Sequence, residues 1–307
     1  MRDVFVTRLV EEAEQDERIN LITGDLGFGV LHRFWDRFPA RFLNAGVAEQ
    51  LMTGVATGLA MEGRIVCTYS IANFPTLRCL EQIRNDAAYH DANVKVVAIG
   101  GGFSYGALGM SHHATEDLAI LRALPQVTVF APGCDWEAQE CTSAMLRQPG
   151  VCYLRLDKST AGITGRPGET FEVGVPRTLR EGSALTLITC GGILGEVLGA
   201  ADMLARDGIA VRVLSIPTLK PLRSEQIIAA ARETDGILTV EEHVLTGGLG
   251  STIAEVLMDV GVQPRRFLRL GISGGYSSIV GSQEYLRRRH GLDASSIATR
   301  ARALLAE

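Results

Sequence analysis

The sequence predicts an α/β protein with two domains, each a mostly parallel sheet with helices on both faces. Short apolar segments of strand length alternate with segments of helical periodicity along the chain, which is typical of parallel sheets covered on both faces. The alternation restarts after a stretch rich in glycine and proline at 159–182. With 307 residues, 46% of them hydrophobic, the chain can bury two cores. We therefore expect a first domain over 1–158, a linker over 159–182 and a second domain over 183–307.

The charge distribution gives no reason to expect nucleic acid or an anionic membrane as a partner. The formal net charge is −5, and acidic and basic residues are interspersed. The local basic cluster from Arg287 to His290 is interpreted as a solvated helix face.

Cysteine usage and the N-terminal residues favour a reducing, cytoplasmic setting. The six cysteines show neither a C-x-x-C pair nor the spacing of metal ligands, so the sequence suggests neither a disulfide framework nor a zinc site. Asp3 lies where a signal peptide needs an apolar core, and no window approaches about 18 uninterrupted apolar residues. We expect neither export nor a membrane span.

In the first domain, helices and strands are expected to alternate in chain order. The predicted elements are a helix over 4–16, a strand over 19–23, a helix that opens at Glu49, a strand over 64–69, a helix from about 76 to 89, a strand over 94–99, a helix with Glu116 and Asp117 in its first turn, and a last strand over 151–156.

The second domain repeats the pattern from residue 184 onwards. We expect strands over 185–190, 211–216 and 236–240, and helices over 196–207, 225–233 and 250–260.

The helix that opens at Glu49 carries the first candidate site residue. An acid in a first turn is ordinarily a solvated side chain favoured by the helix dipole. This helix, however, contains Gly54 and Gly58, and such a helix gains stability only when something packs closely against it. We therefore expect Glu49 to point into a crowded interior, where a carboxylate needs a partner.

A glycine-rich loop follows the strand that ends at Thr23. Ligands of open α/β sheets bind at the carboxyl ends of strands, which makes the loop 24–29 with Asp25 a candidate ligand site. The alternative is a plain turn.

A second glycine-rich loop, over 100–113, ends in two adjacent histidines. Glycines remove side-chain bulk beside His112 and His113, groups that can move protons near pH 7. Both could also ligate a metal, but no third ligand with suitable spacing follows, so we expect no metal site on this chain.

Several segments resemble the transketolase-like, thiamine-diphosphate-dependent enzymes. The segments RFLNAGVAEQ at 41–50 and SHHATEDLAILRALPQVTVFAPGCDWEA at 111–138 resemble the pyrimidine-binding domain of that family, while LKPL, VEEH and GGLGS resemble its C-terminal domain. The resemblance covers nearly the whole chain in family order. It implies that the two predicted domains are a pyrimidine-binding domain and a transketolase C-terminal domain.

The resemblance also implies a cofactor site. Glu49 matches the glutamate that bonds N1′ of the aminopyrimidine and so helps the cofactor to lose its C2 proton. Phe74 matches the ring that stacks on the aminopyrimidine, Tyr69 is a second candidate for this pocket, and Asp25 matches the acidic member of the loop that faces the cofactor. Without the resemblance, aromatic residues at such a turn would be interpreted as core.

Further residues are implied at the substrate side. His112 matches a histidine that faces substrate and reaction intermediate, and His113 is its neighbour. Arg78 either reaches this site or bridges subunits. Arg155 either binds a phosphate or acid group of the substrate or is an exposed arginine at a strand end.

One element of such enzymes is missing from the sequence. The family grips Mg²⁺ and the diphosphate with a domain marked by Gly-Asp-Gly, and this chain contains no Gly-Asp-Gly. We therefore expect the Mg²⁺ ligands and the diphosphate site on a separate subunit, in a split transketolase of α₂β₂ composition. The implied reaction moves a two-carbon ketol unit from a phosphorylated ketose to an aldehyde.

The loop before His112 departs from the family. Many transketolases have an acid where Leu108 stands and a histidine where Gly100 stands, so recognition of the ordinary donor sugar is in question. Two alternatives stay open: the β subunit of a 2-oxo acid dehydrogenase, and a regulatory subunit that keeps the fold without the chemistry.

Overall fold

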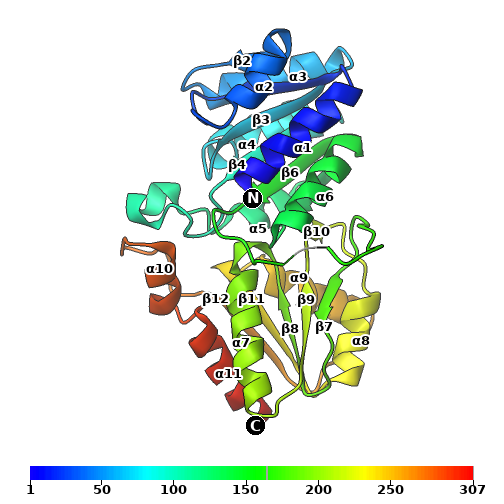
Figure 1. The fold of residues 1–307 in the computed structure, drawn as a ribbon, viewed down its shortest axis with the longest axis vertical. Coiled ribbons are helices and arrows are strands. Elements are labelled where there is room, and N and C mark those ends of the chain that lie inside the picture. Colours follow the sequence, from blue (N-terminus) through cyan, green and yellow to red (C-terminus); the bar gives the residue numbers. More distant parts are fainter. Residues whose placement is uncertain (164, 307) are drawn as a thin grey trace.

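The computed structural model describes residues 1–163 and 165–306, and it confirms the predicted fold class. Two α/β units, each with its own mostly parallel sheet, lie one above the other along the long axis of the molecule (Figure 1). Residue 164 of the predicted linker and residue 307 of the predicted second domain lie outside the described residues.

The first sheet has seven strands in the order β10-β5-β6-β4-β3-β1-β2, and all neighbours are parallel except β10 and β5. Its strands are β1 (Ile19–Thr23), β2 (Phe42–Asn44), β3 (Ile65–Ile71), β4 (Val94–Ile99), β5 (Val127–Phe130), β6 (Val151–Leu156) and β10 (Thr218–Lys220). The buried strands are almost entirely apolar, as a sheet covered on both faces requires.

Helices cover both faces of this sheet. One apolar cluster joins the sheet to α1 (Arg2–Gln15), α2 (His32–Arg37) and α6 (Asp135–Arg147). The other joins it to α3 (Glu49–Met61), to the helical segment 77–88 and to α5 (Asp117–Ala123). The sheet therefore separates two cores.

The helix expected at about 76–89 has mixed geometry. It begins as a 3₁₀ turn over Leu77–Cys79, passes through α4 (Leu80–Gln82) and widens into a π-helix over Ile83–Ala88. The wider turn keeps Cys79, Ile83, Ala87 and Ala88 on the buried face. Side-chain periodicity alone cannot reveal such a change, because it records burial and not the hydrogen-bond pattern.

The second sheet has five strands in the order β12-β11-β8-β9-β7, of which only β7 is antiparallel to its neighbour. Its strands are β7 (Arg177–Arg180), β8 (Leu185–Thr189), β9 (Val211–Ser215), β11 (Ile237–Val244) and β12 (Phe267–Ile272). Its helices are α7 (Leu194–Arg206), α8 (Glu225–Glu233), α9 (Leu249–Asp259), α10 (Gln283–Arg289) and α11 (Ala294–Ala306). Helices α7 and α11 pack on one face and α8 and α9 on the other.

Strand β10 crosses from one half of the chain to the other. The LKPL segment lies in the predicted second domain, yet Thr218 and Lys220 pair with β5 at the edge of the first sheet. Lys220 Nζ also donates to the carbonyl oxygens of Arg122 and Leu124 at the end of α5, where a cation complements the helix dipole. The first sheet is therefore completed by residues beyond the predicted boundary at 158.

The basic cluster from Arg287 to His290 is not wholly a solvated face, so that interpretation was wrong for its first member. Arg287 is 4% exposed, and its Nε lies 2.5 Å from Oε2 of Glu242 in β11.

All six cysteines are buried free thiols. No helix in residues 1–163 or 165–306 is long and apolar enough to cross a membrane.

Candidate active site

Three loops meet at the carboxyl edge of the first sheet, because parallel strands all end at the same edge. The loop 24–29 follows β1, the turn 72–76 follows β3, and the loop 100–113 follows β4. Open α/β sheets place their ligands at this edge. The segment after β4 also protrudes from the molecule on the same side as α10 (Figure 1).

Glu49 is buried at the start of α3 and has an ionic partner. Its side chain is 2% exposed, and Oε2 lies 2.6 Å from Nη1 of Arg78, whose side chain is 44% exposed. Oε1 accepts no hydrogen bond from the described residues. The expectation of a buried, partnered carboxylate is met within the chain, and a solvated first-turn acid is not what the structure shows.

The close packing expected on the glycines of α3 is absent among the described residues. A Cβ atom on Gly54 or Gly58 would meet nothing within 4 Å among the described residues, so nothing in the chain itself packs on these glycines. A Cβ on Gly24, by contrast, would come within 3.1 Å of Cγ of Glu49. The close approach to Glu49 therefore comes from the loop after β1.

Phe74 and His112 lie next to this ion pair. The guanidinium carbon of Arg78 is 4.7 Å from the centroid of the Phe74 ring, and the rings of Phe74 and His112 meet edge to face with centroids 5.1 Å apart. Four side chains from three segments, Glu49, Arg78, Phe74 and His112, therefore form one group, here called the Glu49 cluster. Arg78 is therefore a member of this cluster, and its role, in binding substrate or in bridging subunits, stays a prediction.

The His112 ring is suited to neutral hydrogen bonding. Burial, and then the neighbouring His113, lower the pKa of His112, so the neutral form of the ring predominates at pH 7. Its Nδ1 lies 3.0 Å from Oγ of Ser111. A neutral imidazole in this setting can both accept and donate a hydrogen bond.

Asp25 belongs to the loop beside Glu49 and is fixed by Asn44. Its backbone N–H donates to Oδ1 of Asn44 over 3.0 Å, and Nδ2 of Asn44 donates to Oδ1 of Asp25 over 2.9 Å. Asp25 has a φ of 58°, in the left-handed region. This reciprocal pair ties the loop after β1 to the end of β2.

Two predicted residues lie in the interior instead of in the Glu49 cluster. Tyr69 is 1% exposed and stacks on Phe5 of α1 with ring centroids 6.0 Å apart. His113 is 3% exposed, its Nε2 lies 3.2 Å from the carbonyl oxygen of Gly106, and its ring meets the edge of Phe103.

Arg155 is not brought to the Glu49 cluster, and the alternative of an exposed strand-end arginine was wrong. It is 3% exposed, lies 3.6 Å from Oδ1 of Asp117 and 3.9 Å from Oδ1 of Asp157, and donates to the carbonyl oxygen of Glu242. Burial disfavours the charged guanidinium, but the charges of Asp117 and Asp157 outweigh burial and raise the pKa of Arg155. Asp117 is likewise a buried partner and not only a first-turn acid.

Asn73 has a structural role that the sequence did not predict. Its Nδ2 donates to the carbonyl oxygens of Ser111 and His113, at 3.3 and 2.9 Å, and so ties the turn after β3 to the loop 100–113. An asparagine next to a candidate ring in a strand-to-helix turn was the available signal. In the part of the chain that the structure describes, no three His, Cys, Asp or Glu side chains come together in a way that could hold a metal ion.

Comparison with known families matches both halves of the chain. Residues 1–163 match the transketolase pyrimidine-binding domain, and residues 174–297 match the transketolase C-terminal domain.

Individual relatives match over almost their full length. The chain is 34% identical over 298 residues to an apulose-4-phosphate transketolase subunit of Actinobacillus succinogenes, covering 97% of this chain and 96% of the relative. It is 34% identical over 298 residues to the 6-deoxy-6-sulfo-D-fructose transketolase subunit SqwH of a Clostridium species, covering 97% and 92%. A solved structure described as a split gene transketolase, inactive beta4 tetramer, matches with a TM-score of 0.90 at 33% identity, covering 99% and 98%.

Proposed function

Since this chain belongs to the transketolase family, as a subunit of the split kind, we propose that its Glu49 cluster holds the aminopyrimidine end of thiamine diphosphate. The protein is a transketolase-like transferase subunit that works with a separate subunit. The observation that carries the proposal is the buried Glu49 carboxyl beside a half-buried aromatic ring and a histidine.

The residues present suit an aminopyrimidine. Glu49 keeps Oε1 without a hydrogen bond from the described residues, Gly24 has no side chain to fill the space beside this carboxyl, and the half-buried ring of Phe74 can stack on a flat heterocycle. Bound thiamine diphosphate supplies the carbon atom that takes up the ketol unit.

Each residue of the cluster then has a distinct task. Glu49 would hold or give up a proton at its carboxyl for the aminopyrimidine, and Phe74 would stack on that ring. His112, neutral at pH 7, hydrogen-bonds an oxygen of the substrate. The exposed part of Arg78 is the cation of the cluster and offers a partner for a phosphorylated donor. His113 and Arg155, both buried, support the loop 100–113 from behind.

We place the Mg²⁺ and diphosphate contacts on the partner subunit, because the sequence contains no Gly-Asp-Gly. The surface of α3 offers a docking face for another subunit. Leu51 and Met61, at 61% and 63% exposed, flank the open glycines Gly54 and Gly58, and the spacing puts all four on one side of the helix. This exposed face supports the proposal of an α₂β₂ assembly whose sites lie between unlike subunits.

We infer a ketose phosphate donor other than the one used by an ordinary transketolase. Leu108 is 56% exposed on the loop that carries His112, where an acid would have accepted a hydrogen bond from a sugar hydroxyl. The two relatives are named for different sugars, apulose 4-phosphate and 6-deoxy-6-sulfo-D-fructose, which supports variation of the donor within this type of subunit.

Reconstitution tests the proposal. The purified chain alone should show no ketol transfer and no tight, magnesium-dependent binding of thiamine diphosphate, and adding the diphosphate-binding subunit of the same organism should restore both. Tight magnesium-dependent cofactor binding by the chain alone would count against the proposal. Release of CO₂ from a 2-oxo acid by the reconstituted pair, without ketol transfer, would instead indicate the dehydrogenase type.

A further inference from the structure

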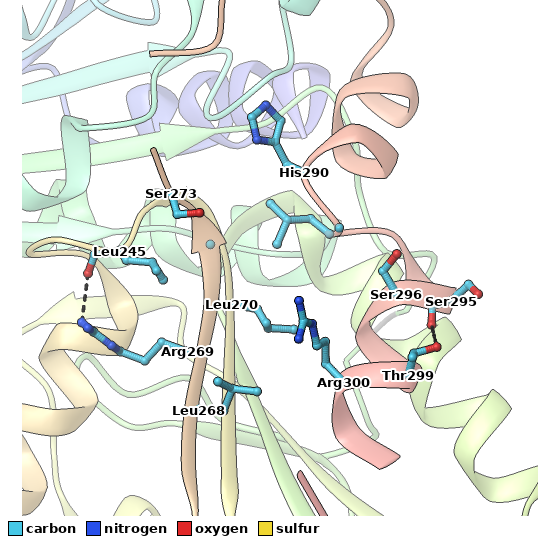
Figure 2. A pocket seen from close by; sticks show the side chains of 13 residues that line it. Leu245, Leu268, Arg269, Leu270, Ser273, His290, Ser295, Ser296, Thr299 and Arg300 are labelled. Carbon is cyan, nitrogen blue, oxygen red and sulfur yellow. Dashed lines mark hydrogen bonds between the residues drawn. The ribbon is translucent and has the colours of Figure 1, made fainter. Parts of the chain in front are cut away.

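The second domain contains a cavity of about 590 Å³ that lies far along the chain from the Glu49 cluster. It runs beside β12, the edge strand of the five-stranded sheet, and is closed on its other side by the junction of α10 and α11 (Figure 2). We call it the β12 cavity. Its volume falls in the range of small-molecule sites, which is about 300–1,000 Å³, and none of its lining residues belongs to the Glu49 cluster.

The lining of the β12 cavity is cationic and free of acids. Among the described residues that line it there are two arginines and no Asp or Glu. Arg300 is exposed and has no ionic partner among the described residues, and Figure 2 shows it extending from α11 towards Leu270 of β12. Nη1 of Arg269 donates only to uncharged oxygens, the carbonyl of Leu245 and Oγ of Ser251. Neither guanidinium group therefore forms an ion pair with a carboxylate of the described residues, although burial raises the pKa of Glu241 and the charge of Arg269 partly offsets that rise.

Neutral donors and apolar walls complete the lining. Ser273 provides a hydroxyl group, whereas Thr299 already donates its hydroxyl proton to the carbonyl oxygen of Ser295. Leu268 and Leu270 provide an apolar wall along the strand (Figure 2). Glu196 accepts from the N–H of Ala294 at the start of α11, so the helix end is partly satisfied and the arginines are the main attraction for an anion. A planar guanidinium favours phosphate, which it can bind through two parallel hydrogen bonds.

The β12 cavity is connected to the loop 100–113 through contacts between aromatic rings. His290 lines the cavity, and its ring stacks on Phe103 with centroids 5.0 Å apart and planes 21° apart. The buried Phe103 in turn meets His113 edge to face with centroids 5.1 Å apart, and His113 adjoins His112. Phe103 is also fixed by its N–H, which donates to Oε1 of Glu242 in the second domain. A shift of His290 must therefore move the loop or break this stack.

We propose that the β12 cavity binds a phosphate monoester and that an occupied cavity stabilises the loop 100–113 through His290 and Phe103. Arg300 and Arg269 bind the phosphate group, and the apolar wall of β12 receives the organic part of the ligand. The binding step stands on the cavity alone, whereas its consequence for catalysis rests on the proposed function of His112.

Binding is tested on the full chain by calorimetric titration with glycerol 3-phosphate, with inorganic phosphate and acetate as comparison ligands. Saturable binding of the ester is expected, and Arg300→Gln should weaken it about tenfold to a hundredfold, the effect of losing a charge-assisted hydrogen bond. Arg232→Gln, an exposed arginine on α8, is the matched control and should bind as the wild type does. Equal affinities in all three proteins, or no saturation by about 10 mM, a very weak affinity, overturn the proposal, and equal affinity for acetate overturns the assignment to phosphate.

A second experiment tests the connection between the β12 cavity and the loop 100–113. Amide hydrogen exchange over 102–113 should slow several-fold when the ester is added to wild type, and His290→Ala should bind the ester but show no slowing. His290→Phe keeps an aromatic ring on Phe103 and should retain the effect. Slowing that persists in His290→Ala would overturn the proposed route. Neither measurement uses the cofactor or turnover, so both remain decisive if the proposed function of the Glu49 cluster fails.

Discussion

Oε2 of Glu49 accepts a hydrogen bond of 2.6 Å from Nη1 of Arg78, and this contact joins the start of α3 to the start of the helical segment 77–88. It satisfies a buried carboxylate that would otherwise lack a partner. It also means that one oxygen of the proposed proton-sharing group is occupied by a cation, while the other is free to face a ligand.

Glu49→Gln separates catalysis from structure. The amide preserves volume and helix but cannot share a proton, so the reconstituted enzyme should lose about 10²–10⁴ in rate, the usual contribution of general acid–base assistance. The measurement is exchange of the C2 proton of bound thiamine diphosphate in wild-type and variant pairs. Glu81→Gln, an exposed acid on α4, is the control. Equal exchange rates with equal cofactor binding would falsify the role of Glu49.

Arg78→Gln should destabilise the isolated chain, because it removes the partner of a buried carboxylate. Removing one member of a fully buried pair costs about 3–5 kcal/mol, but Arg78 is 44% exposed, so solvent screening reduces the expected loss to about 1 kcal/mol. Urea unfolding measures this loss. Arg84→Gln in the same helical segment should cost only a few tenths of a kcal/mol. Equal losses in the two variants would show that the ion pair of Arg78 and Glu49 adds no stability of its own.

Gly58→Ala should have opposite effects on stability and on assembly. A Cβ at this position meets nothing within 4 Å among the described residues, so alanine should stabilise the isolated chain by up to about 1 kcal/mol through helix propensity. If α3 docks on another subunit, the same methyl group should weaken assembly with the partner, and Gly58→Leu should weaken it further. Urea unfolding and analytical ultracentrifugation measure the two effects. Undiminished assembly of Gly58→Leu would exclude this face of α3 as the docking surface.

Leu108→Asp should restore an acceptor for a substrate hydroxyl. A charge-assisted hydrogen bond is worth about 1.5–3 kcal/mol, so kcat/KM for xylulose 5-phosphate should rise about tenfold to a hundredfold in the reconstituted enzyme. Met110→Asp adds the same charge to a side chain of similar exposure, 54% against 56%, and should give no such gain. A wild-type enzyme that already prefers xylulose 5-phosphate would contradict the inference about the donor.

Glu241 should make folding stability fall as pH rises. Burial raises the pKa of Glu241 to about 7, even though Oε2 and Oε1 accept from the N–H groups of Leu249 and Gly250. Between pH of about 4.5 and 7 the folded state therefore holds a proton that the unfolded state has lost, so stability is highest at the acid end of this window.

The variant Glu241→Gln lacks this titration. Relative to the variant, wild type should lose up to about 3 kcal/mol of unfolding free energy between pH 4.5 and 8. Urea unfolding at the two pH values measures it, and Glu225→Gln, an exposed acid on α8, should follow the wild type. Parallel pH profiles for wild type and Glu241→Gln would show that Glu241 ionises normally in the fold.

The sequence by itself determined the order of elements and the segments that form the Glu49 cluster. Strands β1, β4 and β6 have their predicted positions because continuous apolar runs are needed wherever a sheet is covered on both faces. The proximity of Glu49, Phe74 and His112 follows from the parallel sheet, whose strands end at one edge. The resemblance of the quoted segments added the chemistry that such a cluster serves.

Only the tertiary structure decided which neighbours these residues have. Local periodicity indicates that a position is buried but not which residues bury it. It therefore could not predict that β10 pairs in the first sheet or that Arg155 lies beside Asp117 and Asp157. Nor could it predict that no described residue packs on Gly54 and Gly58. The stack of Phe103 on His290 joins residues far apart in the chain. Such contacts depend on how the two sheets meet, and that arrangement is set by packing between distant segments rather than by any one of them.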